Sequence, residues 1–74
     1  MDLEIIFAEV FAVPQRTVQD SLRLREIPSW DSMSHILLIA RLEERFSIEF
    51  TGDEIADFRT VGDIRNAISQ HGGK

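Results

Sequence analysis

The chain has 74 residues, of which 43% are hydrophobic and 28% charged, so its composition is that of a small globular domain and is too apolar for a disordered segment. A formal net charge of -5 disfavours binding to nucleic acid or an anionic membrane and favours basic protein partners. Cysteine is absent, which excludes disulfides, thiolate zinc sites and a protein thiol nucleophile. With no stretch near the ~20 apolar residues of a membrane span, we expect residues 1–74 to be a single, monomeric, cytoplasmic domain.

The first predicted helix and the loop after it occupy the N-terminal part of the chain. Apolar residues recur there at helical spacing, at Leu3, Ile6, Phe7, Val10 and Phe11. This pattern predicts an amphipathic helix from Asp2 to about Ala12. From Val13 to Ser29 the chain has two prolines and no sustained apolar period, which predicts a long ordered loop. Loops of this length are uncommon in compact domains unless they are functional, and this one leads to Ser32.

The second predicted helix is the longest. It runs from about Ser32 to Arg45 or Phe46, with Asp31 as an N-cap whose carboxylate complements the helix dipole. We expect one apolar stripe to cover the core and a second set to lie on its flank. The stripe comprises Ile36, Ile39, Leu42 and Phe46, and the flank comprises Met33, Leu37 and Ala40.

Two capping-box spacings predict two further helices. Thr51 with Glu54 starts a short helix, from about Gly52 to Asp57, and Thr60 with Asp63 starts the last one. The inward-facing residues of the last helix are Val61, Ile64, Ala67 and Ile68, and the segment His71-Gly72-Gly73 ends it.

The predicted fold class is all-α. Residues Phe46 to Phe50 alternate over too few positions to build a sheet, and Ile48 and Phe50 are expected to plug the end of the core. We therefore expect a small bundle of three main helices and one short helix, with a long first loop.

Charge is unevenly distributed along the chain. The balance is -5 from Ser29 to Phe58, -2 before this segment and +2 after it. The middle segment is therefore the expected docking region. A solvated acidic face without a partner is the alternative.

Ser32 is the most informative residue. It follows Trp30 and Asp31 at the point where the loop ends and the long helix begins, so its hydroxyl should be exposed. Backbone N–H groups of a first helical turn favour a phosphate attached at such a position. This placement suits a phosphodiester anchor better than a catalytic nucleophile, and a plain helix cap is the alternative.

Three segments together resemble an acyl carrier protein, and the resemblance extends from about Leu3 to Ile68. They are Asp31-Ser32-Met33, the run from Leu42 to Phe50, and the run from Thr60 to Ile64. The resemblance implies a four-helix bundle of the acyl-carrier type. It also implies that Ser32 receives 4'-phosphopantetheine from coenzyme A, through a separate, magnesium-dependent phosphopantetheinyl transferase. Asp31 matches the acid before the modified serine, with an implied role in orienting the transferase and its magnesium.

The same resemblance implies a carrier and not an enzyme. The arm would hold an acyl, aminoacyl or hydroxyacyl group as a thioester and present it to a loading enzyme and to downstream transferases or synthases. By position, the expected docking residues are Met33, Leu37, Ala40, Arg41 and Glu44. Core packing is the alternative for Met33 and Leu37, and simple solvation is the alternative for Glu43 and Glu44.

Two departures separate the chain from carriers of fatty-acid synthesis. Pro28-Ser29-Trp30 stands where those carriers have small residues and often glycine, and Leu37 stands where they have an acid. The segment from Trp30 to His35 looks more like stand-alone carriers of specialised biosynthesis. Trp30 is alternatively an aromatic lid that closes the loop over the core.

Other function classes remain as alternatives. Ser32 and His35 lie on one helix face, as in a hydrolytic pair, but no Gly-x-Ser-x-Gly elbow accompanies them. His35 is then a polar surface residue or a partner contact. Asp53, Glu54 and Asp57 match no calcium loop, so no metal site is expected. An unmodified acidic helical interaction module, in which Ser32 is only a cap, is the main rival.

Overall fold

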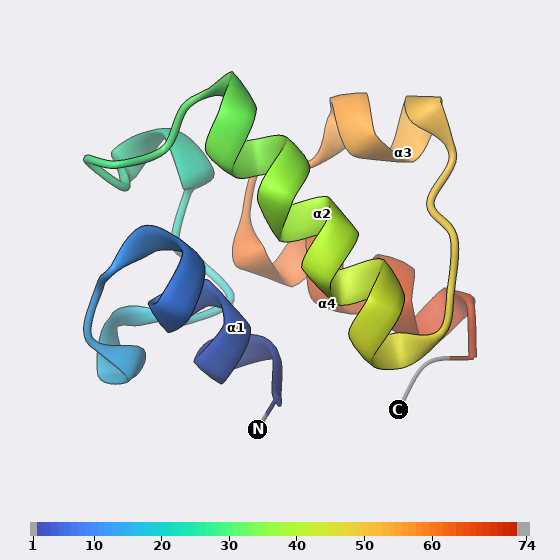
Figure 1. The fold of residues 1–74 in the computed structure, drawn as a ribbon, viewed down its shortest axis with the longest axis horizontal. Coiled ribbons are helices and arrows are strands. Elements are labelled where there is room, and N and C mark those ends of the chain that lie inside the picture. The colour runs from blue at the N-terminus through green and yellow to red at the C-terminus, as the bar shows by residue number, and fades with distance from the viewer. Residues whose placement is uncertain (1, 73–74) are drawn as a thin grey trace.

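The computed structural model describes residues 2–72 and shows an all-α arrangement of four helices within them (Figure 1). They are α1 (Asp2–Phe11), α2 (Ser32–Phe46), α3 (Gly52–Asp57) and α4 (Val61–Gln70). The predicted fold class and helix order are confirmed, and the helices begin and end within about a residue of the expected positions. Among these residues the chain forms no strand, and an isolated bridge joins Arg23 to Thr60. Gly73, part of the predicted helix end, lies outside the described residues.

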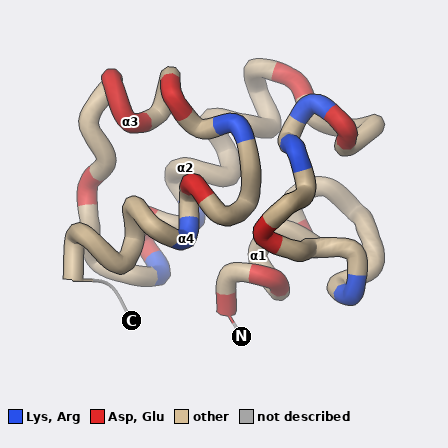
Figure 2. Tube along the Cα trace, turned by 180° about the vertical axis from the view of Figure 1, so that it is seen from behind, with Lys and Arg blue, Asp and Glu red and all other residues tan. Residues whose placement is uncertain are grey.

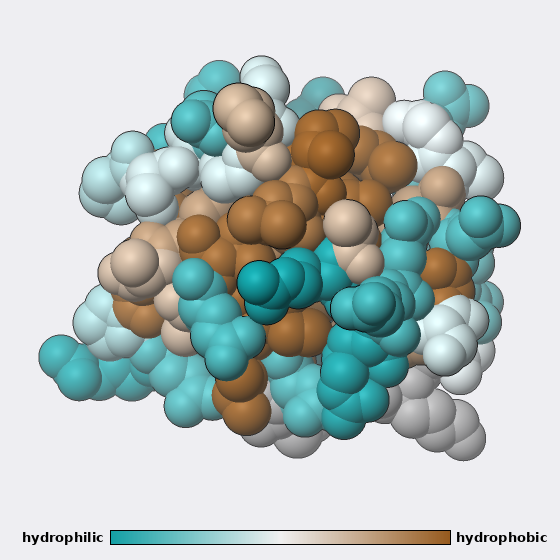
Figure 3. Space-filling model, viewed as in Figure 1, coloured by the Kyte–Doolittle hydropathy of each residue, from teal (hydrophilic) through white to brown (hydrophobic). Residues whose placement is uncertain are grey.

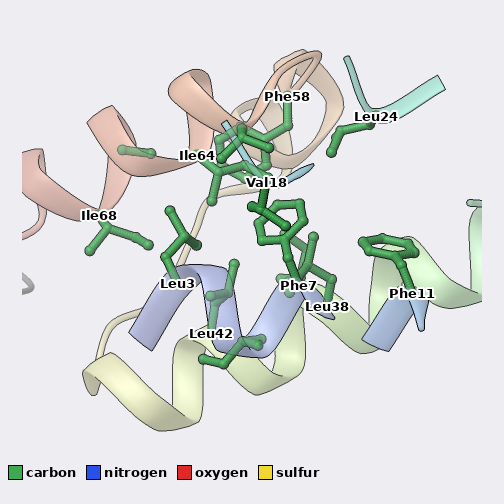
Figure 4. Packing of buried hydrophobic residues seen from close by; sticks show 14 of the residues in the cluster. Leu3, Phe7, Phe11, Val18, Leu24, Leu38, Leu42, Phe58, Ile64 and Ile68 are labelled. Atoms are coloured by element: carbon green, nitrogen blue, oxygen red, sulfur yellow. The ribbon is translucent and has the colours of Figure 1, made fainter. Parts of the chain in front are cut away.

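The hydrophobic core lies between α1, α2 and α4 and is closed by side chains from the first loop (Figure 4). Its most completely buried side chains come from each of these helices and from the loop. They are Phe7, Phe11, Leu24, Leu38, Leu42, Val61 and Ile64. The inward-facing residues predicted for α4 are all buried. Phe50 is buried and Ile48 is half-buried against the same core, as the sequence predicts.

The core-facing side of α2 differs from the predicted stripe. Leu38, which the prediction omitted, is fully buried, and it packs together with Ile39 and Leu42. Ile36, which the prediction placed in the core, is 61% exposed. The reason is geometric: three-residue steps drift around a helix of 3.6 residues per turn, so Ile36 lies about 120° from Leu42. The predicted stripe was wrong at Ile36.

The long first loop is more regular than the sequence suggests. It contains two 3-10 turns, η1 (Gln15–Thr17) and η2 (Leu24–Glu26). Val18, Leu24 and Ile27 anchor it in the core. Backbone hydrogen bonds also join the loop to the segment that leads into α4. In one of them, the Leu24 N–H donates to the Arg59 C=O over 2.9 Å. This pairing holds the loop in place without a strand.

Gly62 allows the loop to approach α4 closely. Its backbone N–H donates to the carbonyl of Asp20 over 2.9 Å. A Cβ at this position would lie 3.1 Å from the same carbonyl oxygen. A larger residue would therefore push the loop away from the helix.

Ion pairs connect α1 to α2 and to α4. Arg65 on α4 donates to Glu4 over 2.6 Å and to Asp20 over 2.7 Å. Burial raises the pKa of Glu4, but the Arg65 hydrogen bond, a backbone hydrogen bond and nearby positive charge together outweigh it, so the pKa lies below its usual value. On the other side, Arg45 of α2 pairs with Asp2 of α1. Helix α1 is thus linked by ion pairs to α4 on one side and to α2 on the other.

The helix α3 is tied down mainly at its N-terminus. The predicted capping box is present, with Glu54 N–H donating to the Thr51 hydroxyl and Thr51 N–H donating to Glu54. His71, just after α4, lies 2.9 Å from the Glu54 carboxylate and packs edge-on against Phe50.

Within residues 2–72, no helix has the length and apolar character needed to cross a membrane.

Candidate functional site

Ser32 is the first residue of α2, and its side chain is exposed. Asp31 caps the helix: its carboxylate accepts the Ser34 N–H over 2.8 Å, and the Ser34 hydroxyl accepts the Asp31 N–H over 2.8 Å. The predicted N-cap and the predicted exposure of Ser32 are confirmed. Among the described residues, no hydrogen bond engages the Ser32 hydroxyl. The oxygen is therefore accessible to another protein.

Asp31 places a fixed negative charge beside that oxygen. The Ser34 backbone N–H, and then the Ser34 hydroxyl, hold the pKa of Asp31 below its usual value, so it is ionised at neutral pH. The Ser34 N–H bond to Asp31 occupies one of the first-turn N–H groups that would otherwise be free to bind a phosphate. A phosphate on Ser32 would thus feel both the helix dipole and the opposing Asp31 charge. The arrangement suits an approaching cation better than a preformed phosphate cradle.

Trp30 and His35 form a structural bridge next to Ser32. The Trp30 indole N–H donates to His35 Nδ1 over 3.2 Å, and His35 Nε2 lies 3.3 Å from the carbonyl of Ile55 on α3. A neutral ring protonated on Nε2 satisfies both contacts. His35 is half-buried between the loop, α2 and α3, so it has a structural role in addition to the surface position expected from the sequence. Its contact with a partner stays a prediction. Trp30 packs against the core, as expected for a lid.

This bridge also leaves His35 without a hydrogen bond to Ser32. Both ring nitrogens have partners other than Ser32. A general base must be within hydrogen-bond reach of the nucleophile it activates. Sequence spacing alone suggested the Ser32 and His35 pair, whereas the contact with Ile55 depends on tertiary packing.

An apolar surface follows Ser32 along α2. We call Met33, Ile36 and Leu37 the apolar patch; they are 83%, 61% and 46% exposed. Figure 3 shows hydrophobic side chains gathered over the N-terminal half of α2 and toward α3, bordered by polar residues. The core-packing alternative for Met33 and Leu37 is therefore wrong. Sequence reasoning missed Ile36 as a member of this surface.

The remaining predicted docking residues are also exposed, and they differ in their partners. Ala40 and Glu44 lie on the exposed side of α2. Arg41 is half-exposed, and its guanidinium lies 3.6 Å from Glu9 of α1. The solvated alternative fails for Glu43, which is half-buried and accepts the Phe50 N–H over 2.9 Å. The basic residues of α2 are thus partly neutralised by α1.

Comparison with known families agrees with this arrangement. The family model described as "Phosphopantetheine attachment site" matches residues 2–68. The chain belongs to this family. An acyl carrier protein of Chlamydia trachomatis is 31% identical over 70 residues, which cover 95% of this chain and 91% of the relative. An acyl carrier protein of Acidothermus cellulolyticus is 31% identical over 64 residues, covering 86% and 76% of the two chains.

Solved structures of holo acyl carrier proteins share the fold. One from Geobacter metallireducens superposes with a TM-score of 0.85 at 30% identity, covering 95% of this chain and 80% of that one. One from Nitrosomonas europaea has a TM-score of 0.82 at 28% identity, covering 93% and 89%. The chain is therefore a carrier of the acyl carrier protein family, and its cofactor is 4'-phosphopantetheine.

The residues at the start of α2 fit this cofactor. The Ser32 hydroxyl can form a phosphodiester without displacing any packed side chain, because it is exposed and makes no hydrogen bond among the described residues. When bound, the arm supplies a terminal thiol that the chain itself lacks, since it contains no cysteine. Residues 2–72 contain no cluster of three or more His, Cys, Asp or Glu side chains able to hold a metal ion.

Proposed function

We propose that Ser32 is the residue that carries the phosphopantetheine arm. A transferase would remove the proton from its hydroxyl. The serine oxygen would then attack the phosphorus of coenzyme A that bears the pantetheine arm, displace 3',5'-adenosine diphosphate and form a phosphodiester. The observation that carries the proposal is the exposed Ser32 oxygen, free of hydrogen bonds within residues 2–72, at the first position of α2 beside the ionised Asp31. Asp31 would attract the basic surface or the magnesium of the transferase.

The protein would act as a carrier without catalysing the reactions of its cargo. The two partners of His35 support this, because they leave Ser32 without a hydrogen bond to the neighbouring histidine in the described structure. The arm would hold an acyl, aminoacyl or hydroxyacyl group as a thioester. The absence of cysteine helps, since no side-chain thiol can take the acyl group by exchange.

Partner enzymes would dock on the surface that adjoins Ser32. The apolar patch supplies the centre of this surface, and Ala40 and Glu44 lie further along the same helix. A loading enzyme or downstream synthase would need an apolar contact with a basic rim, in keeping with the net charge of -5. We place the monomeric protein in the cytoplasm, where coenzyme A and its transferase occur. Affinity for such partners should fall as salt is raised.

Modification in vitro tests the attachment site. The chain is incubated with a permissive phosphopantetheinyl transferase, magnesium and coenzyme A, and its intact mass is measured. We expect one added arm on the wild type and on Ser69→Ala, which removes another exposed serine. Ser32→Ala should gain no mass while keeping its helical circular dichroism spectrum. Equal modification of Ser32→Ala and the wild type would refute the assignment.

The same variants separate the carrier from an interaction module. If a partner enzyme uses the protein as a carrier, product formation should stop in Ser32→Ala while binding persists. Ile36→Ser should weaken binding without preventing folding, because Ile36 is exposed. Product formation that continues with Ser32→Ala would instead support an unmodified module.

A further inference from the structure

A pocket lies between the first loop and the start of α4, and Trp30 is one of its lining residues. Its volume is about 470 Å³, within the range of small-molecule sites. Buried Leu24 and Phe58 and half-buried Trp30 supply its apolar lining. The guanidinium-bearing residues around it are Arg23, Arg25 and Arg59. The pocket therefore combines an apolar floor with a positive rim.

These arginines differ from those that stabilise the fold. Arg41, Arg45 and Arg65 each pair with a carboxylate of another element. In the described part of the chain, no ion pair involves the side chain of Arg23, Arg25 or Arg59. Figure 2 shows a blue position on the chain after α3 facing blue positions on the loop opposite. Their positive charges are thus gathered without a structural partner.

One acid does line the pocket, and it is already occupied. Asp63 accepts the backbone N–H groups of Arg59 and Thr60 over 3.0 and 3.2 Å. Its carboxylate caps α4, so it is held by the backbone. Three guanidinium groups against one carboxylate leave a net positive pocket in a chain whose net charge is -5.

We propose that this pocket binds the anionic end of a cargo, a carboxylate or phosphate, carried on the arm of the same molecule. Guanidinium groups bind both anions through paired, charge-assisted hydrogen bonds, and the apolar floor accommodates the carbon chain before the anion. The chemical class of cargo is then an acyl group with a terminal acid, in contrast to a plain hydrocarbon chain. This inference rests on the proposed attachment at Ser32.

The arm can reach the pocket from Ser32. Trp30 lines the pocket and is two residues from Ser32, so their Cα atoms are at most about 7 Å apart. An extended phosphopantetheine arm, with two amide-linked units between phosphate and thiol, is longer than that span. Tethering also gives the cargo a local concentration of the order of millimolar, so a weak site suffices.

Free anions test the pocket without the arm. Trp30 is the only tryptophan in the chain, so its fluorescence reports on the pocket directly. Succinate is titrated into the unmodified protein at constant ionic strength. We expect saturable quenching at millimolar concentrations. Arg59→Gln should weaken binding about fivefold to tenfold, as expected for a lost charge-assisted hydrogen bond.

The chain offers a matched control for charge alone. Arg16→Gln removes the same charge from an exposed arginine on η1 that does not line the pocket. It should change the affinity for succinate by less than about twofold, the effect of a distant, screened charge. Absence of quenching in the wild type, or equal weakening by Arg16→Gln and Arg59→Gln, would overturn the proposal.

Tethered cargo tests the source of the anion. The transferase loads Ser32 from the coenzyme A thioester of succinate or of 4-methylpentanoate, its uncharged isostere, and intact mass verifies loading. Succinyl cargo should quench the fluorescence of Trp30. It should also weaken the binding of free succinate at least about threefold, because the tethered succinyl group competes for the same pocket. The isostere should do neither. Identical behaviour of the two cargoes, with free succinate still bound, would show a site for a free anion only and overturn the cargo role.

Failure of the attachment is recognised separately. If no mass is added at Ser32, the proposed function fails, whereas the titration of free succinate still decides whether the arginine pocket binds an anion.

Discussion

Replacing Leu38 by alanine should destabilise the protein strongly, whereas the same change at Ile36, two residues away, should not. Leu38 is 0% exposed and Ile36 is 61% exposed. A fully buried Leu→Ala change costs about 3 kcal/mol, including the cavity that it leaves. A domain of 74 residues has a total stability of about 4 to 11 kcal/mol. Leu38→Ala therefore removes a large share of it, and the melting temperature should fall by about 12 to 24 °C.

Urea unfolding followed by far-ultraviolet circular dichroism and by Trp30 fluorescence measures both variants. Ile36→Ala should remain within about 0.5 kcal/mol of the wild type, as for an ordinary surface change. Coincident transitions from the two probes justify a two-state treatment. If Ile36→Ala costs as much as Leu38→Ala, the face of α2 assigned to the core is wrong, and with it the apolar patch proposed for docking.

Three further predictions concern contacts between elements. Gly62→Ala should lower the free energy of unfolding by about 1 kcal/mol, because crowding against the loop carbonyl outweighs the gain in helix propensity; a higher urea midpoint would contradict this. In a double-mutant cycle, Glu4→Gln and Arg65→Gln should show a coupling of about 0.5 to 1 kcal/mol, and additive effects would exclude a stabilising pair. Glu54 has a lowered pKa in the folded protein, caused by the Thr51 backbone and then by His71, so its contribution exists above its ordinary pKa near 4.5 and is lost as pH falls through the lowered value. Glu54→Gln should therefore reduce the acid-induced loss of stability, and an unchanged pH profile would disprove the linkage.

The sequence predicted best those features that depend on residues within one turn of each other. Asp31, Thr51 and Thr60 were each identified as helix caps, and each accepts the backbone N–H three residues later. Such bonds form within a four-residue segment, so their geometry follows from spacing alone. The same locality explains why the start of α2, and with it the exposure of Ser32, could be predicted.

Features that depend on packing between distant segments were missed or misassigned. The face of α2 that meets the core was predicted incorrectly at Ile36 and Leu38, because apolar residues surround much of this helix and only the neighbouring elements select the buried side. His35 was expected at the surface, yet Trp30 and the Ile55 carbonyl, on different elements, hold both its nitrogens. No spacing rule reports contacts of this kind.

The arginine pocket illustrates the same limit. Arg23 and Arg25 belong to a loop without apolar periodicity, and Arg59 follows α3 much later in the chain. Only the backbone pairing of the loop with the chain before α4 brings them together. Scattered basic residues in a loop carry no signal of such a cluster until the fold is known.

The most direct test of the carrier assignment is to purify the protein from the cells that make it and map its modification by tandem mass spectrometry of proteolytic fragments. The fragment containing Ser32 should carry one phosphopantetheine arm, and fragment ions should place the added mass on Ser32 and not on Ser29 or Ser34. A protein recovered with Ser32 unmodified while the pathway it serves is active, or with the arm on another serine, would contradict the account.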